Sequence, residues 1–132
     1  MAKAPSATKS PVAPPPPAPA PPALNSGIRD LQGTLVDQLH KLESSLDDTS
    51  DPNAAEAIVR EMQELSHRIG MAGSLLFTQQ SAALDQKVDK IKAATAQVDA
   101  AVAHLSTMSA FVGAMSDFLG LVDEALDLAK TL

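Results

Sequence analysis

The chain has 132 residues and a formal net charge of −6, and it contains no Cys, Trp or Tyr and only three Phe. The absence of Cys excludes disulfides, thiolate metal ligands and cysteine nucleophiles. Lys3 and Lys9 are the only charged residues among the first 23, so removing their two positive charges leaves the rest of the chain at −8. Such a body repels a phosphate backbone, and it lacks the aromatic platforms on which bases stack. We therefore expect no nucleic-acid binding.

Residues 1–24 are expected to form a disordered Pro/Ala-rich tail, because nine of the ten prolines lie within the first 22 residues. The run 11–22, PVAPPPPAPAPP, favours polyproline II. It contains Pro-x-x-Pro spacings without flanking Arg or Lys, which favours a spacer over a docking peptide for a proline-recognising domain. No apolar run of signal-peptide length follows the first basic residues. The expected location is the cytoplasm, with export by a signal-independent route as the alternative.

Apolar residues recur at spacings of three and four over residues 26–48, which predicts a first amphipathic helix. Residues 47–52, DDTSDP, combine turn formers with a proline, and Asp51 followed by Pro52 is typical of a helix start. The same alternation continues over 52–77 and predicts a second helix. A short loop between two such helices indicates an antiparallel hairpin.

The periodicity is lost across 77–83, FTQQSAA, and returns in two segments, roughly 80–104 and 107–131. These segments meet at Leu105 in a step of three, which either overwinds one continuous helix or ends it nearby, and the sequence leaves both open. The predicted fold is all-α, a helical hairpin followed by long heptad-patterned helices, with residues 25–132 forming one helical bundle or coiled coil. The expected core comprises Leu35, Leu39, Leu42, Ile58, Met62, Leu65, Ile69, Val98, Leu105, Val112, Leu119 and Val122.

The sequence contains few motifs that would indicate catalysis, metal binding or phosphate binding. Glu64 and His67 have the Glu-x-x-His spacing of di-metal sites in helical bundles, and Asp37 with His40 is an acidic variant of it. The other two segments would have to supply inward carboxylates, but most of their acids lie off the apolar stripe. Residues 70–73 have glycines at both ends but no following Lys-Ser/Thr, so they form no phosphate loop. We expect a protein that is not an enzyme and has no metal or cofactor.

The C-terminal segment has an apolar face wider than a plain bundle requires. Phe111 and Phe118 flank a stripe that contains two methionines, Met108 and Met115. Wide, Met-containing faces are typical of helices that pack into an oligomer or a partner groove. The alternative is that the first two helices cover this face. The candidate partner-binding residues are Leu105, Met108, Phe111, Val112, Met115, Phe118, Leu119, Val122 and Leu126.

These features predict a non-enzymatic helical interaction protein, such as an adaptor, a chaperone-like accessory subunit or an assembly component. It would bind a larger protein partner or form a homo-oligomer through apolar helix faces. The alternative is a surface-active protein that coats or inserts into a membrane or storage granule, because the Ala-rich, aromatic-poor composition is similar to that of granule-coating proteins of the phasin kind. No motif residue carries this similarity. The uncharged stretch 100–116 is shorter than a membrane span, and the acidic body disfavours anionic lipid.

Overall fold

The structure, a computed structural model, describes residues 24–105 and 107–132, and these ranges contain four helices and no strand. Apart from Leu24, the predicted Pro/Ala-rich tail lies outside the described residues. The helices are α1 (Ser26–Asp48), α2 (Pro52–Ser74), α3 (Ala82–Ala103) and α4 (Met108–Lys130). The prediction of an all-α helical bundle is therefore confirmed.

Local capping explains where three of the helices begin. The Asn25 Oδ1 accepts hydrogen bonds from the backbone N–H groups two and three positions ahead, which caps α1. Asp51 caps α2 in the same way through the N–H two positions ahead, with Pro52 at the first helical position as predicted. The Ser81 hydroxyl caps α3. Thr107 precedes α4 without a side-chain cap.

The question left open at Leu105 is answered by a break between α3 and α4. His104 leaves the helical region, with φ −129° and ψ 58°, and its N–H bonds to the carbonyl of Ala101. The N–H of Thr107 then bonds to the carbonyl of His104. The step of three in the apolar pattern therefore marks the end of one helix and the start of another.

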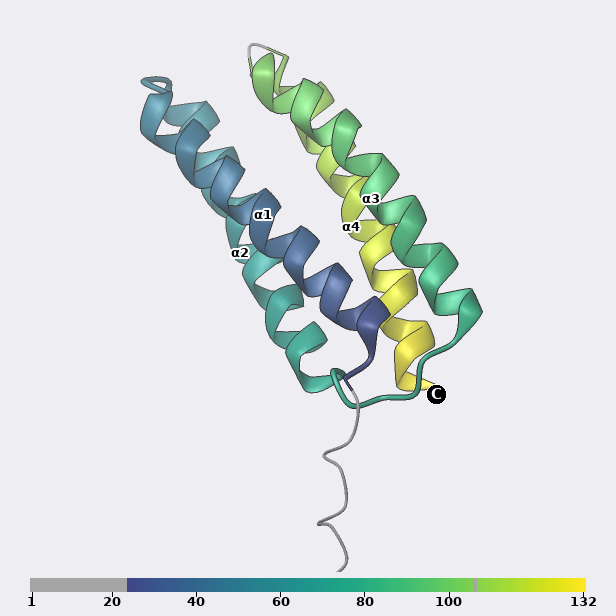
Figure 1. The fold of residues 1–132 in the computed structure, drawn as a ribbon. Helices are drawn as coiled ribbons and strands as arrows, with labels where there is room; N and C mark the ends of the chain where they lie inside the picture. Colours follow the sequence, from purple (N-terminus) through teal and green to yellow (C-terminus); the bar gives the residue numbers. More distant parts are fainter. Residues whose placement is uncertain (1–23, 106) are drawn as a thin grey trace, which may run out of the picture.

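Two antiparallel hairpins pack against each other to form the bundle (Figure 1). The first consists of α1 and α2 and the second of α3 and α4, and contacts within each hairpin are more extensive than contacts between them. Across the bundle, α1 lies beside α3 and α2 beside α4, because the loop 75–81 crosses one end of the molecule. We call this the basal end, where the C-terminus also lies. The other end, with the turn 49–51, the end of α3 and the start of α4, is the distal end.

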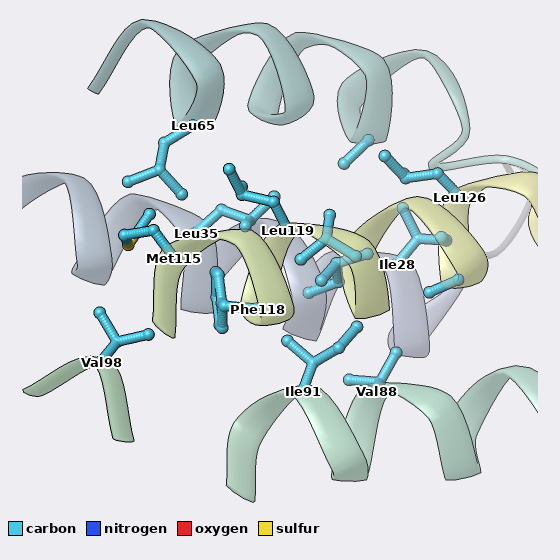
Figure 2. Packing of buried hydrophobic residues seen from close by; sticks show 14 of the residues in the cluster. Ile28, Leu35, Leu65, Val88, Ile91, Val98, Met115, Phe118, Leu119 and Leu126 are labelled. Carbon is cyan, nitrogen blue, oxygen red and sulfur yellow. The ribbon is translucent and has the colours of Figure 1, made fainter. Parts of the chain in front are cut away.

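All four helices contribute to one apolar core (Figure 2). Most of the predicted core residues are buried, and a few are only partly so. Burial in a shared interior is what stabilises amphipathic helices of this length, since isolated helices are marginal in water. The predicted residues that are buried are Leu35, Leu42, Ile58, Leu65, Val98, Leu119 and Val122, and those that are partly buried are Leu39, Met62, Ile69 and Leu105.

The prediction that Val112 lies in the core is wrong, because its side chain is 43% exposed. The neighbouring Phe111 is fully buried instead, as is Phe118 one heptad later. A shift of one residue turns a helix by about 100°. The buried face of α4 is thus centred on the two phenylalanines, whose rings remove more apolar area from water than a valine does.

Phe118 and Val112 differ strongly in their expected contribution to stability. Phe118→Ala should lower the free energy of unfolding by about 3–5 kcal/mol through the lost contacts and the cavity left behind. Val112→Ala should change it by no more than about 0.5 kcal/mol, as is usual for exposed positions. Urea unfolding followed by circular dichroism measures both. Similar effects of the two substitutions would contradict the orientation of α4 described above.

Candidate functional site

Six of the nine predicted partner-binding residues face the interior of the bundle. Of the other three, Leu105 and Met108 are partly buried near the distal end, and Val112 is exposed on α4. While the bundle is closed, these three present most of the surface that the set offers to another molecule, and Leu119, which is 7% exposed, adds a small part of it. The rest is covered mainly by α3 and to a smaller extent by α2, so the alternative drawn from the sequence, cover by the first two helices, describes only part of the packing. Partner binding by the whole face stays a prediction. The six are Phe111, Met115, Phe118, Leu119, Val122 and Leu126.

Phe77 is an exposed residue whose position the sequence pattern did not reveal. The predicted second helix extends to residue 77, whereas α2 ends at Ser74 and places Phe77 in the loop at the basal end. Its side chain is 64% exposed, more than any other large apolar side chain of the described residues. Leu132 at the C-terminus and Leu24, which precedes the Asn25 that bonds to Leu76, are also exposed at this end. The loss of periodicity across 77–83 was the available signal that Phe77 leaves the helical stripe.

The loop that carries Phe77 is held by the fully buried Asn25. The backbone N–H of Asn25 donates to the carbonyl oxygen of Leu76 at 2.7 Å. Its Nδ2 donates to Thr78 Oγ1 at 3.2 Å and to the carbonyl oxygen of Gln79 at 3.1 Å. These bonds draw the chain out of α2 and fix the residues on both sides of Phe77. They explain why the helix is shorter than predicted.

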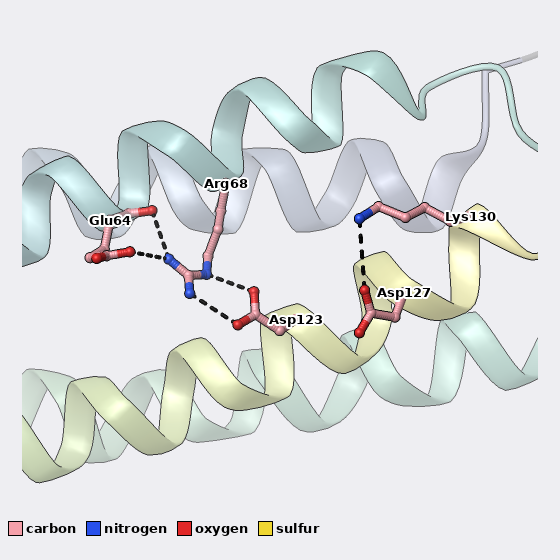
Figure 3. A network of polar contacts seen from close by, with 5 residues as sticks. All are labelled: Glu64, Arg68, Asp123, Asp127 and Lys130. Carbon is pink, nitrogen blue, oxygen red and sulfur yellow. Dashed lines mark hydrogen bonds and ion pairs between the residues drawn. The ribbon is translucent and has the colours of Figure 1, made fainter.

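A groove of about 430 Å³ runs between α2 and α4. A guanidinium closes its basal side: Arg68 Nε donates to Asp123 Oδ1 at 2.8 Å, and Nη2 donates to Asp123 Oδ2 at 3.0 Å (Figure 3). Arg68 Nη1 also donates to Glu64 Oε2 at 2.7 Å. The hydrogen bonds to Asp123 are the main reason that the pKa of Arg68 lies above its usual range. Both carboxylates are therefore held by one permanently charged group.

Glu61 lies in the same groove and is only 9% exposed. Its Oε2 is buried and has no hydrogen-bond partner. Burial raises the pKa of Glu61 above its ordinary value, and the negative charge of Glu64 adds to this, while Arg60 and Arg68 oppose it. On the α4 side the groove is formed by Val112, Ser116, Leu119, Gly120 and Asp123. Glu61, Glu64 and Asp123 outnumber Arg68 there, so the groove is acidic.

A second groove, of about 640 Å³, lies between α1 and α3. Asp30, Asp37, Asp85 and Asp89 line it, and Lys92 Nζ forms an ion pair with Asp30 Oδ2 at 2.8 Å. These carboxylates are exposed to solvent. None of the side chains that line this second groove has a buried polar atom without a hydrogen-bond partner, as Glu61 has in the first groove.

The spacing of Glu64 with His67 and of Asp37 with His40 does not gather metal ligands. His40 and His67 are both exposed. Within residues 24–105 and 107–132, no three His, Cys, Asp or Glu side chains come together in a way that would hold a metal ion.

Comparison with family models, curated proteins and solved structures found no match to this chain. Over the described ranges, none of the helices combines the length and apolar character needed to cross a membrane.

Removing the Glu61 carboxyl should stabilise the bundle in a pH-dependent way. A pKa that is raised in the folded state means that ionised Glu61 opposes folding, fully so above the raised value and not at all below the unfolded value near 4.5. Glu61→Met should therefore raise the free energy of unfolding at pH 7, by about 1–3 kcal/mol as for other unsatisfied buried groups. The gain should be smaller at pH 4.

Urea unfolding of both proteins at pH 4 and pH 7 measures this difference. Glu56→Met is the matched control, because Glu56 is exposed on the same helix and pairs with Arg60 at the surface. An equal gain at the two pH values would show that the charge of Glu61 does not affect stability.

Proposed function

We propose that this protein is a non-enzymatic helical interaction protein, an adaptor or assembly component that binds a larger protein partner or a second copy of itself. The observation that carries the proposal is Phe77, a largely exposed aromatic side chain on a loop fixed by hydrogen bonds. Such a side chain contributes little to the stability of the free protein, because most of its ring stays solvated.

Exposed aromatic residues with apolar neighbours are what protein interfaces use as anchors. At the basal end Leu24 is 37% exposed and Leu132 is 42% exposed, so Phe77 is not an isolated apolar residue there. Asn25 already orders the loop, and binding would therefore cost little additional conformational entropy. This supports the basal end as the main contact surface.

The distal end offers a smaller apolar surface. Leu105 and Met108 are partly buried beside the turn between α3 and α4, and Val112 is exposed one turn further along. These are the members of the predicted partner-binding face that remain accessible at this end of the bundle. We assign them a secondary contact, because the surface has no aromatic residue.

Phe77→Ser tests the main contact. The tagged protein is purified from its native host, bound proteins are identified by mass spectrometry, and the oligomeric state is measured by sedimentation velocity. Loss of a central aromatic anchor should weaken the partner complex or the homo-oligomer by about 30-fold or more, which corresponds to a typical hot spot.

Val59→Ser is the matched control for Phe77→Ser, since Val59 is 39% exposed on α2 away from the basal end. It should leave binding unchanged, and both variants should keep the helicity of the wild type. A Phe77→Ser variant that retains its partner and its oligomeric state at wild-type strength would overturn the assignment of the basal end.

A second candidate function, coating of a membrane or storage granule, is favoured by the way the hairpins meet. The interior is apolar, whereas exposed ion pairs border the seam between α1 and α3: Lys41 with Asp99 at 3.0 Å and Lys92 with Asp30 at 2.8 Å. Exposed pairs of this kind contribute little stability. Separation of the hairpins about the loop 75–81 would present the buried apolar faces to lipid.

A cross-link between the hairpins distinguishes the two functions. The chain has no Cys, so Lys41→Cys combined with Asp99→Cys can be joined specifically by a short bis-maleimide. If opening is required, the joined protein should lose binding to phosphatidylcholine vesicles while the same variant capped with N-ethylmaleimide binds them. Equal vesicle binding by the joined and capped forms would exclude hairpin opening, and retained partner binding by the joined form would support the adaptor function.

A further inference from the structure

We infer that the groove between α2 and α4 binds a lysine side chain of the protein partner, with the Glu61 carboxylate accepting hydrogen bonds from the lysine ammonium. The inference rests on the proposed function, because the lysine belongs to a bound protein. It adds the chemistry by which one partner would be selected over another.

The Glu61 carboxyl is buried and incompletely hydrogen-bonded. It is nine-tenths buried in the lining of a groove, and its Oε2 has no hydrogen-bond partner. Because that oxygen is enclosed by protein, a ligand in the groove would approach the carboxylate at Oε1, where the positive charge of an ammonium would offset the cost of burying the negative charge. The other two carboxylates of the groove, Glu64 and Asp123, are paired with Arg68 and are about half exposed, so Glu61 is the buried carboxylate of the groove that an added cation would stabilise most.

The α4 side of the groove, which lies across from Glu61, is partly apolar and has room for an alkyl chain. Val112 and Leu119 provide apolar surface, and Gly120 has no side chain. Apart from its chain neighbours and the adjacent helix backbone, no heavy atom lies within 4 Å of the place a Cβ of Gly120 would occupy. The four methylene groups of a lysine can lie along such a wall while the ammonium reaches the carboxylate. Because Arg68 and Asp123 close the basal side, the lysine enters from the distal side, past the exposed Val112.

The groove fits an ammonium better than a guanidinium or a calcium ion. A guanidinium prefers two carboxylate oxygens in one plane, an arrangement that Arg68 already has with Asp123, whereas one oxygen of Glu61 is enclosed by protein. A calcium ion takes six or more oxygen ligands, and the described part of the chain gathers no group of three acidic or histidine side chains around a common point. An ammonium is a compact charge that one carboxylate can hold.

The probe for this site is n-butylammonium chloride, which has the stem and head group of a lysine side chain. Protein labelled with ¹³C at the glutamate side chains is titrated by nuclear magnetic resonance, with sodium chloride keeping the ionic strength constant. The expected result is a saturable shift of the Glu61 carboxyl signal and of amide signals over 112–120, together with a lowered pKa of Glu61. n-Butanol, which has the stem without the charge, should bind at least about tenfold more weakly.

Glu61→Gln should reduce n-butylammonium binding by about tenfold or more, because the amide lacks the negative charge. The substitution removes a buried charge, so the variant should fold, which circular dichroism verifies. Glu56→Gln, an exposed change on the same helix, should leave binding unchanged. No saturable shift, equal binding of n-butanol, or unchanged binding to Glu61→Gln would each overturn the lysine site.

The amine titration needs no partner, so it can fail independently of the proposed function. If Phe77→Ser abolishes partner binding while n-butylammonium does not bind, the adaptor function stands and the lysine site falls. If n-butylammonium binds at Glu61 but Glu61→Gln leaves the affinity for the captured partner unchanged, the groove is an amine site that the partner does not use, and the inference is likewise overturned.

Discussion

Every part of this structure depends on the burial of four apolar helix faces in one shared interior. Each helix has 22 or 23 residues and is amphipathic, so it gains most of its stability from packing and little from its own hydrogen bonds. The largest share of the buried residues comes from α4, including two phenylalanines. The apolar face of α4 therefore holds the bundle together, and it becomes available to another molecule only where the bundle opens or where the face reaches the surface.

Polar contacts contribute more to the alignment of the two hairpins than to the free energy of unfolding of the bundle. The ion pairs between α1 and α3 are close to half-exposed, and pairs of this kind contribute little because solvent screens them and ordering costs entropy. Asn25 differs from these ion pairs because it is fully buried, so the loss of any of its hydrogen bonds would leave a polar group without a partner and without water. It connects the start of α1 to a loop more than fifty residues later, and through that loop it determines where Phe77 lies.

The sequence predicted four helical segments and most of their bounds, because these follow from local signals such as the cap at Asp51 and the periodicity of three and four, but it left open whether the last two segments form one helix or two. It did not predict which face of α4 is buried, since Phe111 and Val112 are neighbours and both fit an apolar stripe. Only packing against the other helices decides between them. The end of α2 depends on a bond from Asn25, and the burial of Glu61 depends on α4, so neither could be inferred from residues close in sequence.

Charge and apolar exposure together indicate what kind of partner this molecule would select. The net charge of −8 outside the first 23 residues attracts basic proteins at long range, but such a field discriminates poorly among them. Phe77 would add affinity through apolar burial, which is also weakly selective. A buried carboxyl is selective, because a partner without a matching donor would cover the groove and leave the carboxyl unpaired. Discrimination between partners would therefore depend on Glu61, a residue whose ionised carboxyl opposes folding of the free protein.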